Sequence, residues 1–457
     1  MSERRFLVIG GGIAGLAAAY ELSQREPGWN ITLLEASDRL GGKLKTSEFC
    51  GIAVDEAADG FLRRVPFAMA LCAELGLTDQ LVAPATGHAF VYSRGKLRSL
   101  PEGLMLGVPS DVVAVARSGI LSPLGVARAG LEPFLPRTDP RDSLGGLIEA
   151  RFGKEVLERL VDPLLGGIFA GDASRMSLRA ATPMIADLAG KDRSLLVAAR
   201  KQKAAAKKNP SPPTGPVFAA HRDGMAAIVE ALVAALRKAG VNLRTNTAVA
   251  KLTSTRAGVV VDDGDFVADG AVVATPAFTA ARLLGDSVAP LTAIPYSSVA
   301  MVTMAIPVAD LHAAIGGSGV LVPKAEQRAV TALSWSSKKW AHWQIPGHVL
   351  LRASVGRDGD EHGFALDDDR LTEAVLADLD RLVGIRTNPT AVRISRWAEA
   401  LPQYWPGHVE RINDVRKRLS GAHPNVELAG AAYSGVGIPA CIASGRQAGS
   451  AIHSRPV

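Results

Sequence analysis

Six consecutive residues near the start of the chain have the spacing of a phosphate-binding loop. They are Gly10, Gly11, Gly12, Ile13, Ala14 and Gly15, which form a GxGxxG pattern. The first glycine permits a tight turn, the middle one lets the backbone approach a pyrophosphate, and the last lets a helix pack on a strand. The N-terminus of such a helix stabilises phosphate charge. We therefore expect a dinucleotide at this loop.

The elements around this loop fit the same interpretation. Residues 4–9 are predicted to form a strand, residues 13–24 a helix and residues 31–35 the next strand, a βαβ unit of about 30 residues. Glu35 ends the second strand, 20 residues past Gly15. A carboxylate at this place suits the hydroxyls of an adenosine ribose.

The residues after Glu35 favour FAD over NAD. The spacing ExxxRxGG resembles the extended fingerprint of the FAD-binding fold of glutathione-reductase type, which plain NAD dehydrogenases do not need. The further cofactor-binding candidates here are Ala36, Arg39, Gly42 and Lys43. Arg39 would bond near the nucleotide, and the glycines would let the chain pass beneath the pyrophosphate and the ribityl chain.

Three later segments add cofactor candidates. Residues 54–61 resemble the stretch beside the isoalloxazine ring in amine-oxidase-like flavoproteins, although Ala57 replaces the first glycine of that stretch; the candidates are Ala57, Ala58, Asp59 and Gly60. Residues 268–276 resemble the strand that closes the nucleotide domain, and Val249 lies where such proteins pair backbone with adenine. Near the C-terminus, Gly430, Val436, Gly437 and Ile438 precede a predicted helix whose N-terminus would face the flavin N1–O2 edge.

Composition limits the classes of protein that remain. A chain of 457 residues with 47% hydrophobic residues supports at least two domains. The net charge of +6 is either ordinary surface charge or the sign of a mild preference for acidic partners. Its three cysteines have neither the spacing of a disulfide framework nor that of metal ligands, and its histidines form no HxxxH or HxH pair. We therefore expect no disulfide framework and no metal site, which fits a reducing cytoplasm. We read no signal peptide and no transmembrane helix.

Two unusual segments lie in the middle of the chain. Residues 101–135 are apolar, helix-prone and interrupted by Pro and Gly, which favours the core of an inserted helical domain over cavity lining or a membrane surface. Residues 198–208 are basic and helix-prone and precede a Pro-rich loop at 209–216. Because no aromatic residues lie among the basic ones, we do not expect nucleic-acid binding.

The middle and end of the chain resemble a known family, the protoporphyrinogen and coproporphyrinogen oxidases of haem synthesis. The resemblance covers essentially the whole chain. It is most specific in DPLLGGIFAGD at 162–172, SLRA at 177–180, Arg396-Trp397, LPQY at 401–404, Gly407-His408 and the ending GAAYSGVGIPACI.

The resemblance implies an α/β fold: a Rossmann FAD domain of glutathione-reductase type built from both chain ends, an α+β substrate domain and an inserted helical domain. The expected boundaries are 1–85, 216–290 and 401–457 for the FAD domain, 86–215 for the mainly helical insert, and 291–400 for the substrate domain.

The resemblance also implies the chemistry. A porphyrinogen is oxidised stepwise to a porphyrin, flavin N5 accepts hydride, and molecular oxygen reoxidises the flavin to give hydrogen peroxide. No side chain is assigned as catalytic. Gly167, Ile168 and Ala170 would lie near the substrate, and Trp397 would border FAD. FAD would be non-covalent, because residues 396–408 contain no cysteine.

One departure from the family bears on the substrate. Eukaryotic-type members carry an Arg, proposed to hold a propionate, where this chain has Ala89. This favours the Gram-positive type of enzyme, which acts on coproporphyrinogen III and in its actinobacterial form is the nearest resemblance. Four propionates need more cationic contacts than two, and Lys338, Lys339 and Arg352 are the candidates.

Several alternatives stay open. The substrate could be protoporphyrinogen IX, or the enzyme could be an amine oxidase or carotenoid desaturase on the same fold, although 5% aromatic residues fit amine-binding cages poorly. A non-catalytic FAD scaffold or porphyrin carrier is a further alternative. We expect this protein to be soluble and cytoplasmic, with at most peripheral contact with the inner face of the membrane. We also expect it to hand its product transiently to a chelatase.

Overall fold

A five-stranded parallel sheet forms the first of three parts of the molecule. The computed structural model describes residues 4–25, 28–139, 141–208, 215–255, 257–311 and 316–453. The sheet order is β12 (Asn242–Arg244), β2 (Asn30–Leu34), β1 (Arg5–Ile9), β16 (Gly270–Val273) and β22 (Val426–Leu428), and all neighbours are parallel. Its strands therefore come from the beginning, the middle and the end of the chain.

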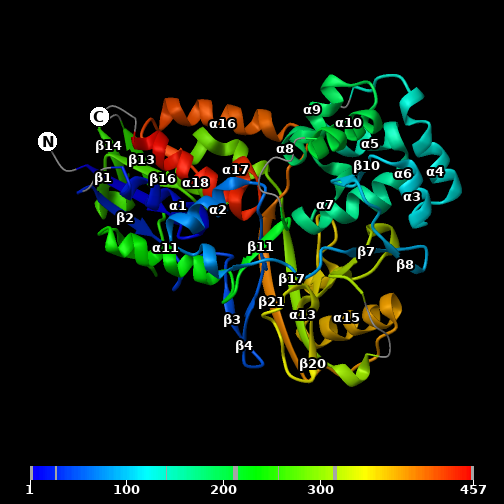
Figure 1. The fold of residues 1–457 in the computed structure, drawn as a ribbon. Helices are drawn as coiled ribbons and strands as arrows, with labels where there is room; N and C mark the ends of the chain where they lie inside the picture. Colours follow the sequence, from blue (N-terminus) through cyan, green and yellow to red (C-terminus); the bar gives the residue numbers. More distant parts are fainter. Residues whose placement is uncertain are drawn as a thin grey trace.

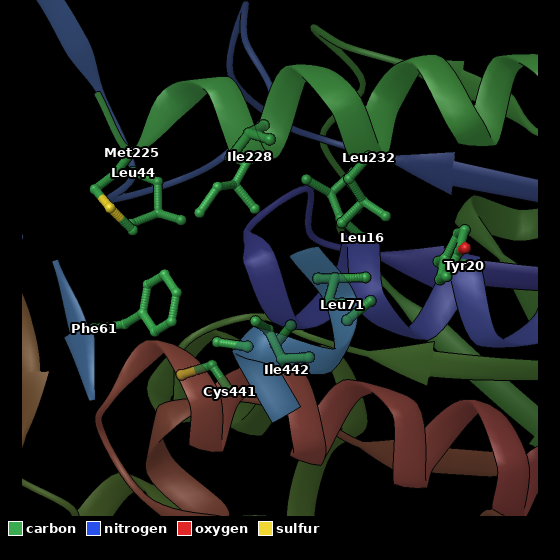
Figure 2. Close-up of a cluster of buried hydrophobic side chains, with 14 of the residues drawn as sticks. Leu16, Tyr20, Leu44, Phe61, Leu71, Met225, Ile228, Leu232, Cys441 and Ile442 are labelled. Carbon is green, nitrogen blue, oxygen red and sulfur yellow. The ribbon is translucent and has the colours of Figure 1, made fainter. Parts of the chain in front are cut away.

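Both faces of this sheet are covered, as its continuous apolar strands require. On β1, Phe6 and Val8 join one buried cluster while Leu7 and Ile9 join another. The first cluster contains side chains from α1 (Ile13–Ser23), α2 (Pro66–Glu74), α11 (Ala226–Lys238) and α18 (Ile438–His453), and Figure 2 shows part of it. The second contains side chains from α12 (Ala277–Leu284), α16 (His408–Ala422), α17 (Ala431–Ser434) and the small sheet of β13 (Leu252–Thr255), β14 (Gly258–Val261) and β15 (Phe266–Ala268).

A seven-stranded sheet forms the second part, below and to the right in Figure 1. Its order is β21 (Ala391–Pro402), β17 (Tyr296–Pro307), β20 (His348–Val355), β19 (Val330–Trp335), β18 (Gly319–Leu321), β7 (Ala89–Ser93) and β8 (Lys96–Ser99). Only the β18–β7 pair is parallel in the described part of the sheet. Helix α15 (Asp368–Val383) packs its apolar side against this sheet.

The third part is helical and lies between the other two in sequence (Figure 1). Its helices are α3 (Val112–Ser118), α4 (Pro123–Gly130), α5 (Leu144–Phe152), α6 (Lys154–Val156), α7 (Asp162–Phe169), α8 (Leu178–Ala181), α9 (Pro183–Lys191) and α10 (Leu195–Lys208). Side-chain oxygens of Asp111, Ser122, Ser143 and Ser177 cap the N-termini of α3, α4, α5 and α8. These caps satisfy backbone N–H groups that a helix leaves unpaired.

The predicted α/β class is confirmed, and the predicted strand, helix and strand at residues 4–9, 13–24 and 31–35 lie within one residue of the observed β1, α1 and β2. One boundary differs: residues 89–99, expected in the helical insert, form β7 and β8 and join the seven-stranded sheet. Most of the Pro-rich loop predicted at 209–216 lies outside the described residues. No helix in the described ranges is long and apolar enough to cross a membrane.

Candidate functional site

The glycine-rich loop joins β1 to α1, as predicted. A Cβ at Gly10 would lie 2.7 Å from the Ala274 carbonyl oxygen, and one at Gly15 would lie 1.9 Å from the Gly10 carbonyl oxygen. A Cβ at Gly12 would meet nothing within 4 Å, and Gly12 caps α1 without any side-chain hydrogen bond. Gly10 and Gly15 are therefore required by packing, whereas Gly12 borders open space at a helix N-terminus, which suits a pyrophosphate.

The second motif folds back onto this loop. The Gly41 N–H donates to the Gly11 carbonyl at 2.8 Å, and the Gly11 N–H donates to Oε2 of Glu35 at 2.6 Å. The Arg39 side chain donates to the Gly42 carbonyl and so stabilises the turn at residues 39–42. Glu35 also accepts the N–H of Thr247 through its backbone carbonyl at 2.8 Å, which brings the segment of Val249 to the same end of the sheet.

Helices α1 and α18 run parallel and in contact (Figure 1). A Cβ at Gly445 would lie 2.0 Å from the Ala14 carbonyl oxygen, and one at Gly449 would lie 2.8 Å from that of Ala18. Helix α18 begins seven residues before Gly445, whereas α1 begins one residue before Ala14. The N-terminus of α18 therefore extends about six residues, or roughly 9 Å, beyond that of α1.

This stagger gives two helix N-termini for one extended ligand. The α1 end suits the pyrophosphate, and the α18 end lies farther along, where the flavin ring of a dinucleotide would be. Anionic groups are stabilised at both ends. Gly430, Val436 and Gly437 lie in the approach to α18, where Gly430 has φ of +128° and its N–H donates to the Ser444 hydroxyl at 3.1 Å.

Lys43 and Cys441 lie near each other at the N-terminal end of α18. The Lys43 side chain is exposed, yet desolvation by the surrounding protein lowers its pKa, which the Cys441 thiol opposes. Phe61 packs in the same cluster as Cys441 (Figure 2), so the residues just before Phe61 lie near this end of α18.

A partly buried charge cluster includes Asp59 of this segment. Asp59 accepts two hydrogen bonds from Lys339 Nζ, both at 2.9 Å, and one from Trp340 Nε1 at 3.0 Å. Arg352 is buried, with its NH1 3.6 Å from Asp59, and donates to the Ala57 carbonyl at 2.6 Å. Burial alone would raise the pKa of Asp59, but the two cations hold it at about 2.

Two of the expected propionate contacts are thus already engaged. Lys339 and Arg352 face a carboxylate of this chain, so neither presents a free charge to a substrate. Lys338 is exposed on α13 (Ser336–Lys339). Trp397 is half-buried on β21 and donates from Nε1 to the Glu56 carbonyl at 3.2 Å, which brings it to the segment of Ala57, Ala58 and Gly60.

Helix α7 carries the expected substrate residues. Gly167 is exposed, and the apolar Ile168 is 44% exposed. Ala170 is buried, ends the helix in a left-handed conformation with φ of +45°, and accepts the Asp358 N–H through its carbonyl at 2.8 Å. The helix thus presents an apolar, side-chain-poor surface that would accommodate a flat apolar molecule.

A cleft of about 800 Å³ lies elsewhere along the same helical part, lined by residues including Glu158, Asp172 and Lys324. Several of its charged groups are paired with one another, for example Lys324 with Asp172 at 2.7 Å. The cleft is lined neither by the glycine loops nor by Gly167 and Ile168, so we do not assign it to the chemistry.

The most informative contacts come from residues to which the sequence assigned no role. Gln403 donates from Nε2 to the Phe169 carbonyl at 2.9 Å and so holds the end of α7. The Tyr404 hydroxyl donates to the Ala431 carbonyl and accepts the Gly435 N–H at 3.0 Å, so it holds the approach to α18. The motif LPQY had flagged this segment, but nothing in the sequence named its partners.

His408 behaves as a structural residue. It is buried, stacks on Tyr404 with ring centroids 4.3 Å apart, and bonds through Nε2 to the Ala432 carbonyl at 3.0 Å. Burial lowers the pKa of His408 to about 4, so it is neutral near pH 7. Within the described ranges, no group of three or more His, Cys, Asp or Glu residues could hold a metal.

Comparison with known proteins agrees with this arrangement. Residues 13–453 match the family described as flavin containing amine oxidoreductase. The chain is 34% identical to the coproporphyrinogen III oxidase of Bacillus subtilis (strain 168), covering 98% of this chain and 97% of that one. It is 36% identical to the coproporphyrinogen III oxidase of Mycobacterium tuberculosis (strain H37Rv), covering 99% and 98%.

Solved structures give the same result. The crystal structure of a putative protoporphyrinogen oxidase from Exiguobacterium sp. 255-15 matches with a TM-score of 0.87 and 32% identity over 99% of both chains. Cyclohexylamine oxidase from Brevibacterium oxydans matches with a TM-score of 0.67 at 18% identity, which shows a shared fold alone. The chain therefore belongs to the flavin-containing amine oxidoreductases, within the group of coproporphyrinogen III and protoporphyrinogen oxidases, and it is a flavin-dependent oxidoreductase.

Proposed function

We propose that this enzyme binds FAD non-covalently and oxidises coproporphyrinogen III to coproporphyrin III in haem biosynthesis, with molecular oxygen as acceptor and hydrogen peroxide as product. One observation carries the proposal: Gln403 holds the end of the apolar helix α7, and the adjacent Tyr404 holds the approach to the staggered N-terminus of α18. This arrangement suits a flat macrocycle stacked against a flavin. Because the relatives are named coproporphyrinogen III oxidases, we take coproporphyrinogen III as the macrocycle.

The chain's own residues would bind and position the two reactants. The loops of Gly10–Gly15 and Glu35–Lys43 would hold the nucleotide, with Val249 beside the adenine. Residues Ala57–Gly60, Trp397 and the Gly430–Ile438 segment would surround the flavin. When bound, FAD supplies the hydride acceptor, and positioning of the macrocycle supplies most of the remaining catalysis.

Gly167, Ile168 and Ala170 would contact the porphyrinogen, and Lys338 would contact a propionate. Lys339 remains a proposed propionate contact only if it shares its charge between Asp59 and the substrate. A Lys338→Met variant should raise KM for coproporphyrinogen III more than for protoporphyrinogen IX, because the former carries more propionates. Equal effects on the two substrates would remove Lys338 from the site.

The decisive experiment mixes the purified, FAD-loaded protein with each porphyrinogen in air. Porphyrin fluorescence and peroxide should appear together, and kcat/KM should be higher for coproporphyrinogen III. A preference for protoporphyrinogen IX would reassign the substrate within the family. Porphyrin binding without turnover or peroxide would instead indicate a carrier that passes porphyrin to a chelatase.

We also propose peripheral contact with the inner face of the membrane, on a specific observation. Leu124, Ala127, Leu131 and Phe134 follow helical spacing along α4 and the turn after it, and Leu124 and Phe134 are 82% and 79% exposed. Arg193, distant in sequence, donates to the Pro133 carbonyl at 2.8 Å and so brings a positive charge to this segment. A positive charge beside apolar side chains would favour an anionic surface.

Flotation with vesicles tests this contact. The protein should float with vesicles containing anionic phospholipid and not with purely zwitterionic ones. A Leu124→Ser, Phe134→Ser variant should stay at the bottom of the gradient while keeping its oxidase activity. Equal flotation of both proteins would exclude this face.

A further inference from the structure

Asp59 is the centre of a partly buried network that joins two distant parts of the chain. Its carboxylate pairs with Lys339 at 2.9 Å and Arg352 at 3.6 Å, and also accepts the Trp340 N–H at 3.0 Å. The side chains of Asp59, Lys339 and Arg352 are 18%, 22% and 3% exposed. Charges that are this well shielded interact strongly with their surroundings, because little water screens them.

This network lies at the proposed flavin end of the cofactor site. Arg352 also bonds to the Ala57 carbonyl at 2.6 Å, and Phe61, two residues after Asp59, packs with Cys441 in the first turn of α18. Strand β5 (Phe61–Leu62) contacts α18 directly (Figure 2). The segment that carries Asp59 therefore joins the charged groups to the strand that contacts the helix proposed to face the flavin.

The charges in the network are unequal. Two cations surround one carboxylate, so the three groups together carry one positive charge. The buried Asp55 lies nearby and interacts electrostatically with both Arg352 and Asp59. Charge near the flavin ring alters the energy of the reduced, more negative flavin relative to the oxidised one.

We propose that Asp59, Lys339 and Arg352 form a charge cluster that sets the reduction potential of the bound flavin. The inference rests on the proposed placement of FAD. In this role Lys339 stabilises the reduced flavin directly through its charge, and Asp59 is a positioning residue that holds Lys339 and limits its effect. Arg352 supplies the second positive charge and fixes the Ala57 backbone.

Two substitutions should shift the potential in opposite directions. Lys339→Met removes a positive charge, so it should make the flavin harder to reduce, by about tenfold in the equilibrium constant, which is about 30 mV for two electrons. Asp59→Asn removes the negative charge, so it should make reduction easier by a similar factor. The double variant should return close to the parent value.

The measurement is the two-electron potential of the FAD-loaded protein against a reference dye at pH 8, above the pKa of about 6 to which burial raises Asp55. Lys339→Arg keeps the charge and should stay within about twofold of the parent. Lys238→Met is the matched control, since it removes an exposed lysine charge from the last turn of α11.

The outcomes separate this inference from the proposed function. Single variants that shift the potential in the same direction, or by less than about threefold, overturn the charge cluster while FAD binding and turnover stand. If the Lys339→Met variant does not retain FAD, the reduction potential of Asp59→Asn alone tests the charge cluster, and it should lie above that of the parent protein. A parent protein that binds no FAD would refute the proposed function itself.

Discussion

Replacing Tyr404 with Phe should weaken FAD binding through a single oxygen atom. The hydroxyl donates to the Ala431 carbonyl and accepts the Gly435 N–H at 3.0 Å, and it is the atom through which Tyr404 holds the loop before α18. The ring itself stacks on His408, and Phe would preserve that contact. The substitution therefore removes two hydrogen bonds and almost no apolar packing.

The magnitude follows from these two bonds. A hydrogen bond contributes about 1 kcal/mol net, and leaving a buried partner unpaired costs about 1–3 kcal/mol. Ala431 and Gly435 are only partly buried, so water can replace part of the loss. We expect a loss of about 2 kcal/mol, and if the loop orders with the cofactor this equals a roughly 30-fold weaker Kd for FAD.

The chain provides a matched control in the same loop. Tyr433 is also buried, but its hydroxyl has no hydrogen-bond partner among the described residues. Tyr433→Phe should therefore leave the free energy of unfolding unchanged or raise it slightly, because it removes an unsatisfied buried polar atom.

Titration of apo-protein with FAD, followed by flavin fluorescence, gives both values of Kd. Urea unfolding of the two variants without FAD gives the part of the loss that belongs to the protein alone. The reasoning fails if Tyr433→Phe is as damaging as Tyr404→Phe, or if Tyr404→Phe changes Kd by less than about threefold.

Three further changes have clear expectations. Burial raises the pKa of Asp55 from 3.8 to about 6, so its ionisation costs about 3 kcal/mol as pH rises from 4 to 7, and urea unfolding of Asp55→Asn should lack that pH-dependent loss. Gly445→Ala places Cβ 2.0 Å from a carbonyl oxygen and should lower the free energy of unfolding by about 3 kcal/mol, whereas the unobstructed helical change Gly421→Ala should raise it by up to about 1 kcal/mol. Gln403→Leu frees the carbonyl of Phe169 and should raise KM for the porphyrinogen about tenfold with FAD content unchanged.

Local patterns predicted the nucleotide loop well because its chemistry is local. Gly10 and Gly15 are required by backbone atoms within the same βαβ unit or its neighbouring strand, whereas Gly12 borders the open space at the helix N-terminus that the proposed pyrophosphate would occupy. Each requirement leaves a trace in residue type and spacing. The same is true of Glu35, which bonds to Gly11 across two adjacent strand ends.

The charge cluster was not predictable in this way. Lys339 and Asp59 are 280 residues apart, and a lysine beside another lysine shows no sign of which one is paired. Cationic residues in a predicted substrate domain suggested propionate contacts, yet the fold gives Lys339 and Arg352 an internal carboxylate. Sequence identifies charge, but only topology identifies the partner.

Apolar content was also an incomplete guide. Residues 101–135 looked like the core of a helical insert, and Ile120 and Leu121 are indeed buried. Leu124 and Phe134 in the same segment are among the more exposed apolar residues described. Short helices joined by turns separate inward and outward faces in a way that a single hydropathy pattern does not reveal.

The end of β21 explains why two distant motifs need each other. Hydride transfer requires reacting atoms about 3–3.5 Å apart, and an error of about 1 Å can cost on the order of 100-fold in rate. Gln403 holds the helix proposed for the substrate and Tyr404 holds the loop proposed for the flavin, and they are adjacent residues just beyond one strand. In the proposed complex, one short piece of backbone would therefore set the separation between macrocycle and flavin, rather than the relative placement of two domains. A porphyrinogen oxidase with no assigned side-chain base depends on this distance more than on any single functional group.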